Sequence, residues 1–453
     1  MQNIYNEVGS LDARCYKEFG LSEDILMENA AQGMAGYIKK RFKKGSHIIV
    51  VSGSGNNGAD GITLSRILHK EYKVELLILK KPSSPMAILQ YKRAKLVGVK
   101  EIKKLKECDL IVDAFVGTGF KGEINIEVKK VFKEIERLKV FKIACDVVSA
   151  NLFSTDVTLT MGALKKSMFL DNVKDLMGEI KVINLGISRE VYETQTNYHL
   201  LDMDDFIRPK RVKSDTHKGS YGHLNVLGGD KLGAGVLSAM SAFRFGAGLV
   251  SIITTKKTKS IPYYIMNDRS LSKNVTAIAC GMGLSKDKKR VKELLDISVP
   301  MVLDADIFSM KIIKKFLYRD DIVLTPHPKE FVSLLKICDI ADIGVSELQK
   351  NRFLYIEMFC QKYPNPTILL KGANVIISSK NRFYINPHGD AKLAKGGSGD
   401  VLAGLIASLL AQGYTPLHSA INGSLAHTKL AQNYTLSDFS LTPEDLIKGI
   451  GNL

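Results

Sequence analysis

Short apolar runs alternate with segments of helical periodicity over the whole length of the chain. Residues 47–51 form a β-branched run, which is typical of a parallel strand buried on both faces. Residues 11–44 instead carry apolar side chains near helical spacing, with charged residues between them. Further strands are expected at 74–79, at 109–113, within 140–149 and within 179–186. This alternation predicts an α/β fold built on a parallel sheet.

The pattern breaks at residues 201–211, where Pro209 lies in a charged and irregular run. Such a run is more typical of a linker than of the interior of an element, so we place a domain boundary near residue 207. Beyond it, apolar runs alternate again with a helical segment at 233–248. A chain of 453 residues exceeds what one core usually serves, and we therefore expect two α/β domains, 1–207 and 208–453.

A glycine-rich turn precedes the longest apolar run of the chain. Gly396, Gly397 and Gly399 allow main-chain amides to approach an anion closely, and the helix that follows adds the positive end of its dipole. Asp400 stands at the start of that helix with no cation beside it in the sequence. It can accept a proton from an alcohol while the amides hold a phosphoryl group. The alternative is that Asp400 only caps and stabilises the helix.

Polar side chains follow the strands predicted in the first half. Asn57, Asp113, Asp146 and Ser149 each come at or just after the end of such a run. Because the carboxyl ends of parallel strands meet at one edge of a sheet, we expect these groups to lie together. The glycine loop at 52–61 fits neither common phosphate motif, so the residues alone indicate either a phosphate-bearing ligand or a cation.

Three further turns in the second half carry candidate chemistry. His327 lies between two prolines, which hold it in a rigid turn at a predicted strand end and make it a candidate site residue; the alternative is an ordinary loop histidine. Asp304 and Asp306 can bind a metal or cap a helix. Lys371 and the glycine after it are suited to contact nucleotide phosphates.

Composition narrows the choice of partners. Lys and Arg outnumber Asp and Glu by 64 to 47, which gives a net charge of +17. Such a charge favours binding of nucleic acid or of small phosphorylated ligands. The basic residues are scattered and lack interleaved aromatics, so we expect no nucleic-acid binding.

The six cysteines show no paired spacing, which indicates neither a zinc site nor a disulfide framework. No signal pattern opens the chain and the run at 401–411 is too short to span a bilayer; we expect a cytoplasmic protein without membrane contact.

The loops of the first half resemble those of the NAD(P)H-hydrate epimerases. The resemblance rests on residues 56–60, 113–123, 146–149 and 158–160. It implies a Rossmann-like three-layer sandwich and a potassium ion held by Asn57, Asp113 and Ser149. It also implies that Asp146 contacts the substrate as acid or base. The same resemblance assigns the damaged dinucleotide to Asn56, Asn57, Gly58, Ala59, Asp60, Gly117, Thr118, Gly119, Phe120, Lys121, Gly122, Glu123 and Asp146. Two departures from the family pattern stand out: Ala59 replaces a usual glycine, and Val148 and Ala150 replace the usual Pro and Gly beside Ser149.

The second half resembles the ribokinase-like fold and, more narrowly, the ADP- or ATP-dependent NAD(P)H-hydrate dehydratases. The motifs that carry it lie at 233–234, 245–249, 304–306, 326–328, 371–375 and 397–404. The resemblance implies a three-layer α/β domain that uses Mg²⁺. It assigns Ala234, Gly283, His327 and Asp400 to the hydrated nicotinamide dinucleotide, and Lys371, Gly372, Ala373, Asn374, Val375 and Gly399 to the adenine nucleotide.

Together the two halves predict a bifunctional repair enzyme for hydrated NADH and NADPH (NADHX and NADPHX). Hydroxide is a poor leaving group, so removal of water requires activation, which phosphorylation supplies. We expect Asp400 to take the proton of the ring hydroxyl while the amides of Gly396 to Gly399 and Mg²⁺ neutralise the phosphoryl group. The first domain would interconvert the R and S hydrates. We expect a homo-oligomer and favour ADP over ATP as donor. The alternative is a ribokinase-like small-molecule kinase with a non-catalytic N-terminal binding module.

Overall fold

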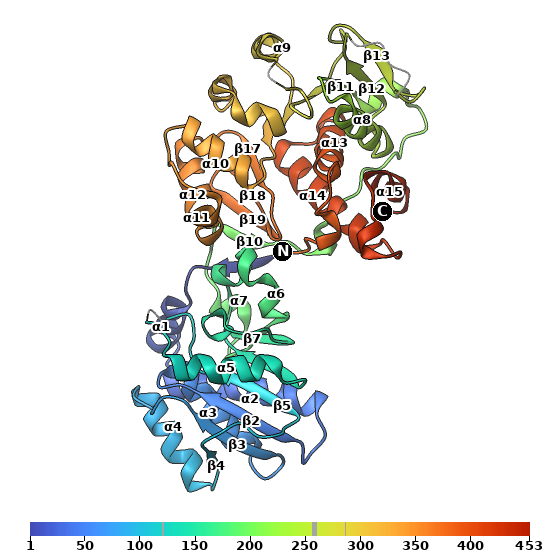
Figure 1. Ribbon diagram of the computed structural model, residues 1–453. Helices are drawn as coiled ribbons and strands as arrows, with labels where there is room; N and C mark the ends of the chain where they lie inside the picture. The colour runs from blue at the N-terminus through green and yellow to red at the C-terminus, as the bar shows by residue number, and fades with distance from the viewer. Residues whose placement is uncertain (120–121, 256–260, 286) are drawn as a thin grey trace. The chain divides into compact units, whose positions relative to one another are not determined.

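The computed structural model describes residues 1–119, 122–255, 261–285 and 287–453, and these form two compact units. One unit comprises Asn3–Thr196, and the other comprises Asn197–Leu453 with Met1–Gln2. Each has its own α/β architecture, so the prediction of a two-domain α/β chain is confirmed (Figure 1). The functional boundary near residue 207 stays a prediction.

The first unit contains a seven-stranded sheet in which all neighbouring strands run parallel. Its order is β4-β3-β2-β5-β6-β7-β9, where the strands are β2 (His47–Ser52), β3 (Lys73–Ile78), β4 (Lys100–Ile102), β5 (Leu110–Ala114), β6 (Phe141–Cys145), β7 (Val157–Met161) and β9 (Glu179–Ile183). In β1 (Gln2–Tyr5), Ile4 and Tyr5 pair with β8 (Leu164–Lys165).

Both faces of this sheet are covered, as the uninterrupted apolar strands predict. Ile48 and Val50 of β2 enter one apolar core, while Ile49 and Val51 enter another on the opposite face. The helices of the unit are α1 (Gly9–Glu18), α2 (Glu23–Arg41), α3 (Asn56–Leu68), α4 (Pro85–Leu96), α5 (Ile126–Arg137), α6 (Lys174–Met177) and α7 (Arg189–Tyr192).

Two boundaries differ from the sequence predictions. The helix expected over 11–44 is two helices, because Gly20 adopts a left-handed φ of 66° and the Ser22 hydroxyl caps α2 by accepting from the Ile25 amide. The loop expected over 52–61 already becomes helix α3 at Asn56. Gly58 permits this early start, since a Cβ there would lie 2.2 Å from the Gly53 carbonyl oxygen.

The second unit contains a mixed sheet in the order β13-β12-β11-β14-β15-β16-β17-β18-β19-β10. All pairings are parallel except those of β18 with its two neighbours. The strands are β10 (Tyr198–Leu200), β11 (His223–Leu227), β12 (Leu249–Ile253), β13 (Met266–Asp268), β14 (Ala277–Cys280), β15 (Met301–Leu303), β16 (Ile322–Leu324), β17 (Thr367–Leu370), β18 (Val375–Ser379) and β19 (Arg382–Asn386).

Helix α13 lies at the centre of this unit, between α8 and α14 and against the sheet (Figure 1). Every residue from Val401 to Ala411 is buried. Gly404 allows this helix to approach α8 closely, since a Cβ there would lie 2.3 Å from the Ser238 carbonyl oxygen. The helices are α8 (Leu232–Arg244), α9 (Lys288–Glu293), α10 (Pro328–Ile337), α11 (Val345–Lys350), α12 (Arg352–Lys362), α13 (Ser398–Ala411), α14 (Pro416–Gln432) and α15 (Pro443–Gly449). Within the described ranges, no helix combines the length and apolar character needed to cross a membrane.

Candidate active sites

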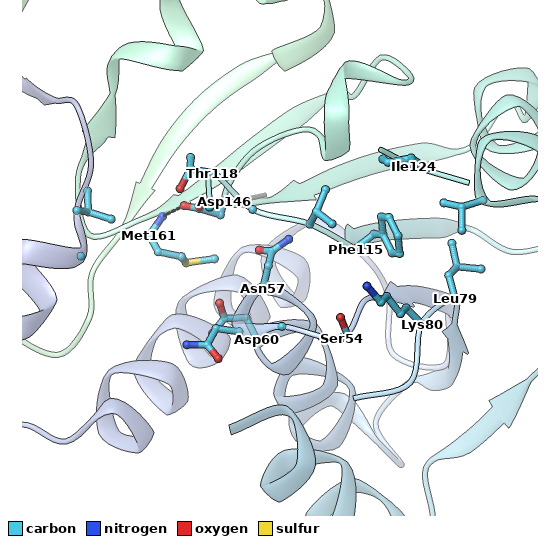
Figure 2. Close-up of a pocket in the computed structure, with 18 of the residues that line it drawn as sticks. Ser54, Asn57, Asp60, Leu79, Lys80, Phe115, Thr118, Ile124, Asp146 and Met161 are labelled. Atoms are coloured by element: carbon cyan, nitrogen blue, oxygen red, sulfur yellow. Dashed lines mark hydrogen bonds between the residues drawn. The ribbon is translucent and has the colours of Figure 1, made fainter. Parts of the chain in front are cut away.

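The first unit holds a cavity of about 650 Å³ beside the carboxyl ends of β2, β5 and β6 (Figure 2). Parallel sheets commonly bind ligands at this edge. Most of the predicted binding residues line it, namely Asn56, Asn57, Asp60, Gly117, Thr118, Gly119, Glu123 and Asp146. Gly58 and Ala59 are buried in α3, and Gly122 is exposed. Phe120 and Lys121 lie outside the described residues.

Asp146 is held by three donors immediately after β6. Its Oδ1 accepts from the Lys165 Nζ at 2.5 Å and from the Thr160 hydroxyl at 3.3 Å. It also accepts from the Met161 amide at 3.2 Å (Figure 2). The residue adopts a left-handed φ of 69°, a conformation that aspartate tolerates better than most residues. The carboxylate is therefore fixed at the cavity wall by hydrogen bonds and by an ion pair.

Lys165 is a residue of this candidate site that the sequence analysis missed. Its side chain is fully buried, and its ammonium also donates to the Thr160 hydroxyl at 2.7 Å and the Met161 carbonyl at 3.3 Å. A buried ammonium is stable only when it is paired and hydrogen-bonded. A lysine directly after the apolar stretch 161–164 was the available signal, but one lysine is more often exposed.

Asp12 of α1 is a second carboxylic acid of this cavity that the sequence analysis did not single out. Its Oδ1 accepts from the Tyr192 hydroxyl at 2.7 Å. Burial raises the pKa of Asp12 above its usual value, and the Asp146 charge adds to this effect. Burial raises the pKa of Asp60 on α3 well above its usual value, again with contributions from Asp146 and Asp12.

The residues predicted to hold potassium include one tight pair and one unpartnered amide. Asp113 is fully buried within β5 and accepts from the Ser149 hydroxyl at 2.7 Å and the Ser149 amide at 2.8 Å. Burial raises the pKa of Asp113 to about 6. The buried amide group of Asn57 has no hydrogen-bond partner among the described residues. Oxygen ligands of this kind suit a hard cation, so the residues present fit a potassium ion.

The two departures from the family pattern have different structural costs. Ala59 lies within helix α3, where an alanine is well tolerated. Ala150, directly after Ser149, adopts a left-handed φ of 48°. This conformation costs a residue with a Cβ roughly 1 kcal/mol more than glycine, so the turn that presents Ser149 is mildly strained.

In the second unit, Asp400 occupies the first turn of α13 beside other charged groups. Helix α13 begins after Gly397, whose φ of 89° favours glycine. The pKa of Asp400 is raised to about 6, first by burial and next by the Asp304 charge, while the Lys371 charge opposes the shift. The carboxyl group thus changes charge near the pH at which a general base operates.

A buried arginine holds the turn that carries Lys371 through hydrogen bonds to its main chain. The guanidinium of Arg352 donates to the carbonyl oxygens of Lys371 at 3.0 Å and of Asn374 at 2.9 Å. Lys371 pairs with Asp304 at 2.7 Å, and a Cβ at Gly399 would lie 3.3 Å from its ammonium. Lys371 and Gly399, both predicted to bind the nucleotide, therefore lie side by side.

The residues predicted to bind the dehydratase substrate lie on separate turns. Ala234 and Gly283 are linked through Lys231, whose carbonyl accepts from the Ala234 amide and whose amide donates to the Gly283 carbonyl. His327 caps α10: its Nδ1 accepts from the Lys329 amide at 3.1 Å, and its Nε2 lies 2.9 Å from Glu330. Within the described ranges, no three His, Cys, Asp or Glu side chains form a metal-binding group.

A buried serine and histidine support the glycine turn and were not found from the sequence. The Ser398 hydroxyl lies 3.0 Å from the Nε2 of His427 on α14. Burial lowers the pKa of His427 to about 4, and the nearby Lys371 charge contributes. His427 is therefore neutral at pH 7, and it ties the turn to a second helix.

The chain matches two family models. Residues 224–452 match the model described as NAD(P)H-hydrate dehydratase, and residues 23–167 match the model described as YjeF-related protein N-terminus. The bifunctional NAD(P)H-hydrate repair enzyme Nnr of Helicobacter pylori is 40% identical, and the alignment covers 100% of both chains. The protein of the same name from Dictyoglomus turgidum is 30% identical over 98% of this chain and 96% of its own.

Solved structures resemble part of the chain. One is the ADP/ATP-dependent NAD(P)H-hydrate dehydratase from Bacillus subtilis, co-crystallised with ATP and Mg²⁺. It is 26% identical, covers 55% of this chain and 94% of that chain, and superimposes with a TM-score of 0.46.

Proposed function

Because the chain belongs to the family of bifunctional NAD(P)H-hydrate repair enzymes, we propose that Asp146 and Asp400 carry out its two reactions. The chain combines an NAD(P)H-hydrate epimerase domain with an ADP/ATP-dependent dehydratase domain. The family predicted from the sequence is thereby confirmed. We assign the epimerase to 1–207 and the dehydratase to 208–453.

Asp400 is the proposed base of the dehydratase. It takes the proton of the hydroxyl on the ring carbon, and that oxygen accepts the terminal phosphoryl group of ADP or ATP. The lone pair of the ring nitrogen then expels phosphate, which leaves far more readily than hydroxide, and forms a carbon–nitrogen double bond. Loss of a proton from the neighbouring ring carbon to water then restores the conjugated ring. Mg²⁺, when bound with the nucleotide, supplies charge neutralisation for the transferring group. The observation that supports this assignment is a half-buried carboxyl at a glycine-rich helix start, with a pKa raised to about 6.

The surrounding residues receive the roles implied by the family motifs. Lys371 provides a positive charge near the nucleotide phosphates while Arg352 keeps its turn rigid. We propose the adenine nucleotide at Lys371, Gly372, Ala373, Asn374, Val375 and Gly399, and the hydrated dinucleotide at Ala234, Gly283, His327 and Asp400. ADP is the proposed donor.

In the epimerase, Asp146 is the proposed base, held in place by its ion pair with Lys165. The hydrated dinucleotide would occupy the cavity beside it. Potassium would be held by Asn57, Asp113 and Ser149; its role is to fix the loops that meet the substrate. The unpartnered Asn57 amide supports this assignment. A homo-oligomer remains our expectation.

The test is to mix the purified chain with the R and S hydrates of NADH, ADP or ATP, and Mg²⁺. The absorbance of NADH should return for both epimers. Return for the S hydrate alone would contradict the epimerase assignment, and no return with either donor would contradict the dehydratase assignment.

A further inference from the structure

A carboxylic acid without a partner faces Asp146 across the epimerase cavity. Asp60 lies on α3, on the wall opposite Asp146, and both side chains border the same space (Figure 2). Asp60 also borders a smaller adjoining cavity of about 90 Å³. No group in the described part of the chain forms a hydrogen bond or ion pair with Asp60. The cavity therefore offers this carboxyl group to a bound ligand.

The two carboxyl groups have opposite surroundings. Asp146 accepts from an ammonium, a main-chain amide and a hydroxyl, so donors surround its Oδ1. Asp60 has none of these donors and lies near the fixed negative charge of Asp146, which favours the protonated form. Two carboxyl groups on facing walls, one held by donors and one without them, are placed to act as the base and the acid of one reaction.

We propose that Asp60 is the general acid of the epimerase and acts with Asp146 as its general base. The inference rests on the epimerase function and on the base role of Asp146 proposed above. It extends that proposal by assigning the proton donor.

The reaction would proceed by exchange of water at the ring carbon beside the ring nitrogen. Asp60 gives its proton to the hydroxyl oxygen, the carbon–oxygen bond breaks, and the nitrogen lone pair forms a carbon–nitrogen double bond as water leaves. Water then adds to the opposite face, the double-bond electrons return to nitrogen, and Asp146 takes the proton that the entering water loses. Proton exchange with solvent afterwards restores protonated Asp60 and ionised Asp146.

The charge state of Asp60 depends on every ionisable group that faces it. Burial is the largest cause of its raised pKa, and the charges of Asp146, Asp12 and Glu23 act in the same direction while Lys165 opposes them. Tyr16 borders the same small cavity as Asp60. The charge of Asp60 in turn contributes to the raised pKa of the Cys145 thiol. Since the acid acts only while protonated, the wild-type epimerase rate should fall as alkaline pH removes this proton.

Asp60→Asn preserves the shape of the side chain and removes the proton donor. Without ADP or ATP, so that no hydrate is consumed, we expect its kcat for R-to-S conversion to fall at least about 100-fold. Its KM should change little, and its alkaline loss of rate should vanish. Asp60→Glu, which keeps a carboxylic acid, should recover part of the rate. Glu134→Gln removes an exposed carboxylate of α5 and should match the wild type.

Kinetic, binding and isotope-labelling measurements distinguish this inference from the epimerase function on which it rests. If Asp60→Asn keeps its kcat, or changes only KM, Asp60 is not the acid, whereas retained epimerisation in Asp146→Asn would overturn the base assignment instead. Loss of dinucleotide binding by Asp60→Asn would show a binding role and also overturn the inference. In H₂¹⁸O, each wild-type epimerisation should introduce one labelled oxygen; epimerisation without label would refute the exchange step.

Discussion

Asp400 combines a position at a helix start with a pKa of about 6, so its ionised form dominates at neutral pH. Asp400→Asn should reduce dehydration at least about 1,000-fold, because general-base catalysis is lost together with the charge beside Lys371. Binding of ADP or ATP should remain within a few-fold of wild type. In the wild type, kcat/KM for dehydration should rise with pH up to about 6 and then level off. Undiminished turnover in the variant would contradict the assignment.

Helix α13 is packed so closely against α8 that Gly404 has no room for a side chain. In Gly404→Ala the new Cβ would lie 2.3 Å from the Ser238 carbonyl oxygen and 2.9 Å from the Ser241 Cβ. The free energy of unfolding should therefore fall by about 1–3 kcal/mol in urea titrations. Gly36→Ala in α2 is the comparison, since a Cβ there meets nothing within 4 Å. It should be neutral or raise stability by up to about 1 kcal/mol. If Gly404→Ala and Gly36→Ala changed the free energy of unfolding equally, the close approach of α13 to α8 would be contradicted.

Helix α14 contributes a pH-dependent stability through His427. This residue has a folded pKa of about 4 and an unfolded pKa near 6.5. Between these values the unfolded chain binds a proton that the folded chain does not. Stability therefore rises with pH through this window and is lost as pH falls from about 6.5 toward 4. In His427→Gln, the loss of unfolding free energy between pH 7 and pH 5 should be smaller by about 2 kcal/mol. An unchanged pH dependence in urea titrations would contradict a buried neutral histidine.

The two proposed reactions share the S hydrate, and we expect it to diffuse freely through solution from one to the other. Asp146→Asn should repair only the S hydrate, and Asp400→Asn should epimerise without repairing either. An equimolar mixture of the two variants should therefore restore repair of both hydrates at a rate clearly above that of either variant alone. The measurement is the return of NADH absorbance from an R and S mixture, corrected for the rate without enzyme. Failure of the mixture would show that the reactions require one intact chain.

The sequence by itself determined the architecture and the main chemistry. Apolar runs of strand length, such as 47–51, require burial on both faces, and the structure divides their side chains between two cores. The glycine turn before Asp400 and the polar residues after the first-half strands located both candidate sites, because glycine and strand-end positions follow from local backbone geometry.

Only the tertiary structure decided which ionisable side chains lie close enough to influence one another's pKa values. Lys165, Asp12 and His427 were missed since their roles depend on burial and on partners elsewhere in the chain: Lys165 on Asp146, Asp12 on Tyr192, and His427 on Ser398. The start of α3 at Asn56 likewise depends on the close approach of Gly58 to Gly53. Sequence patterns record local propensity, whereas desolvation and pairing arise only when distant segments meet.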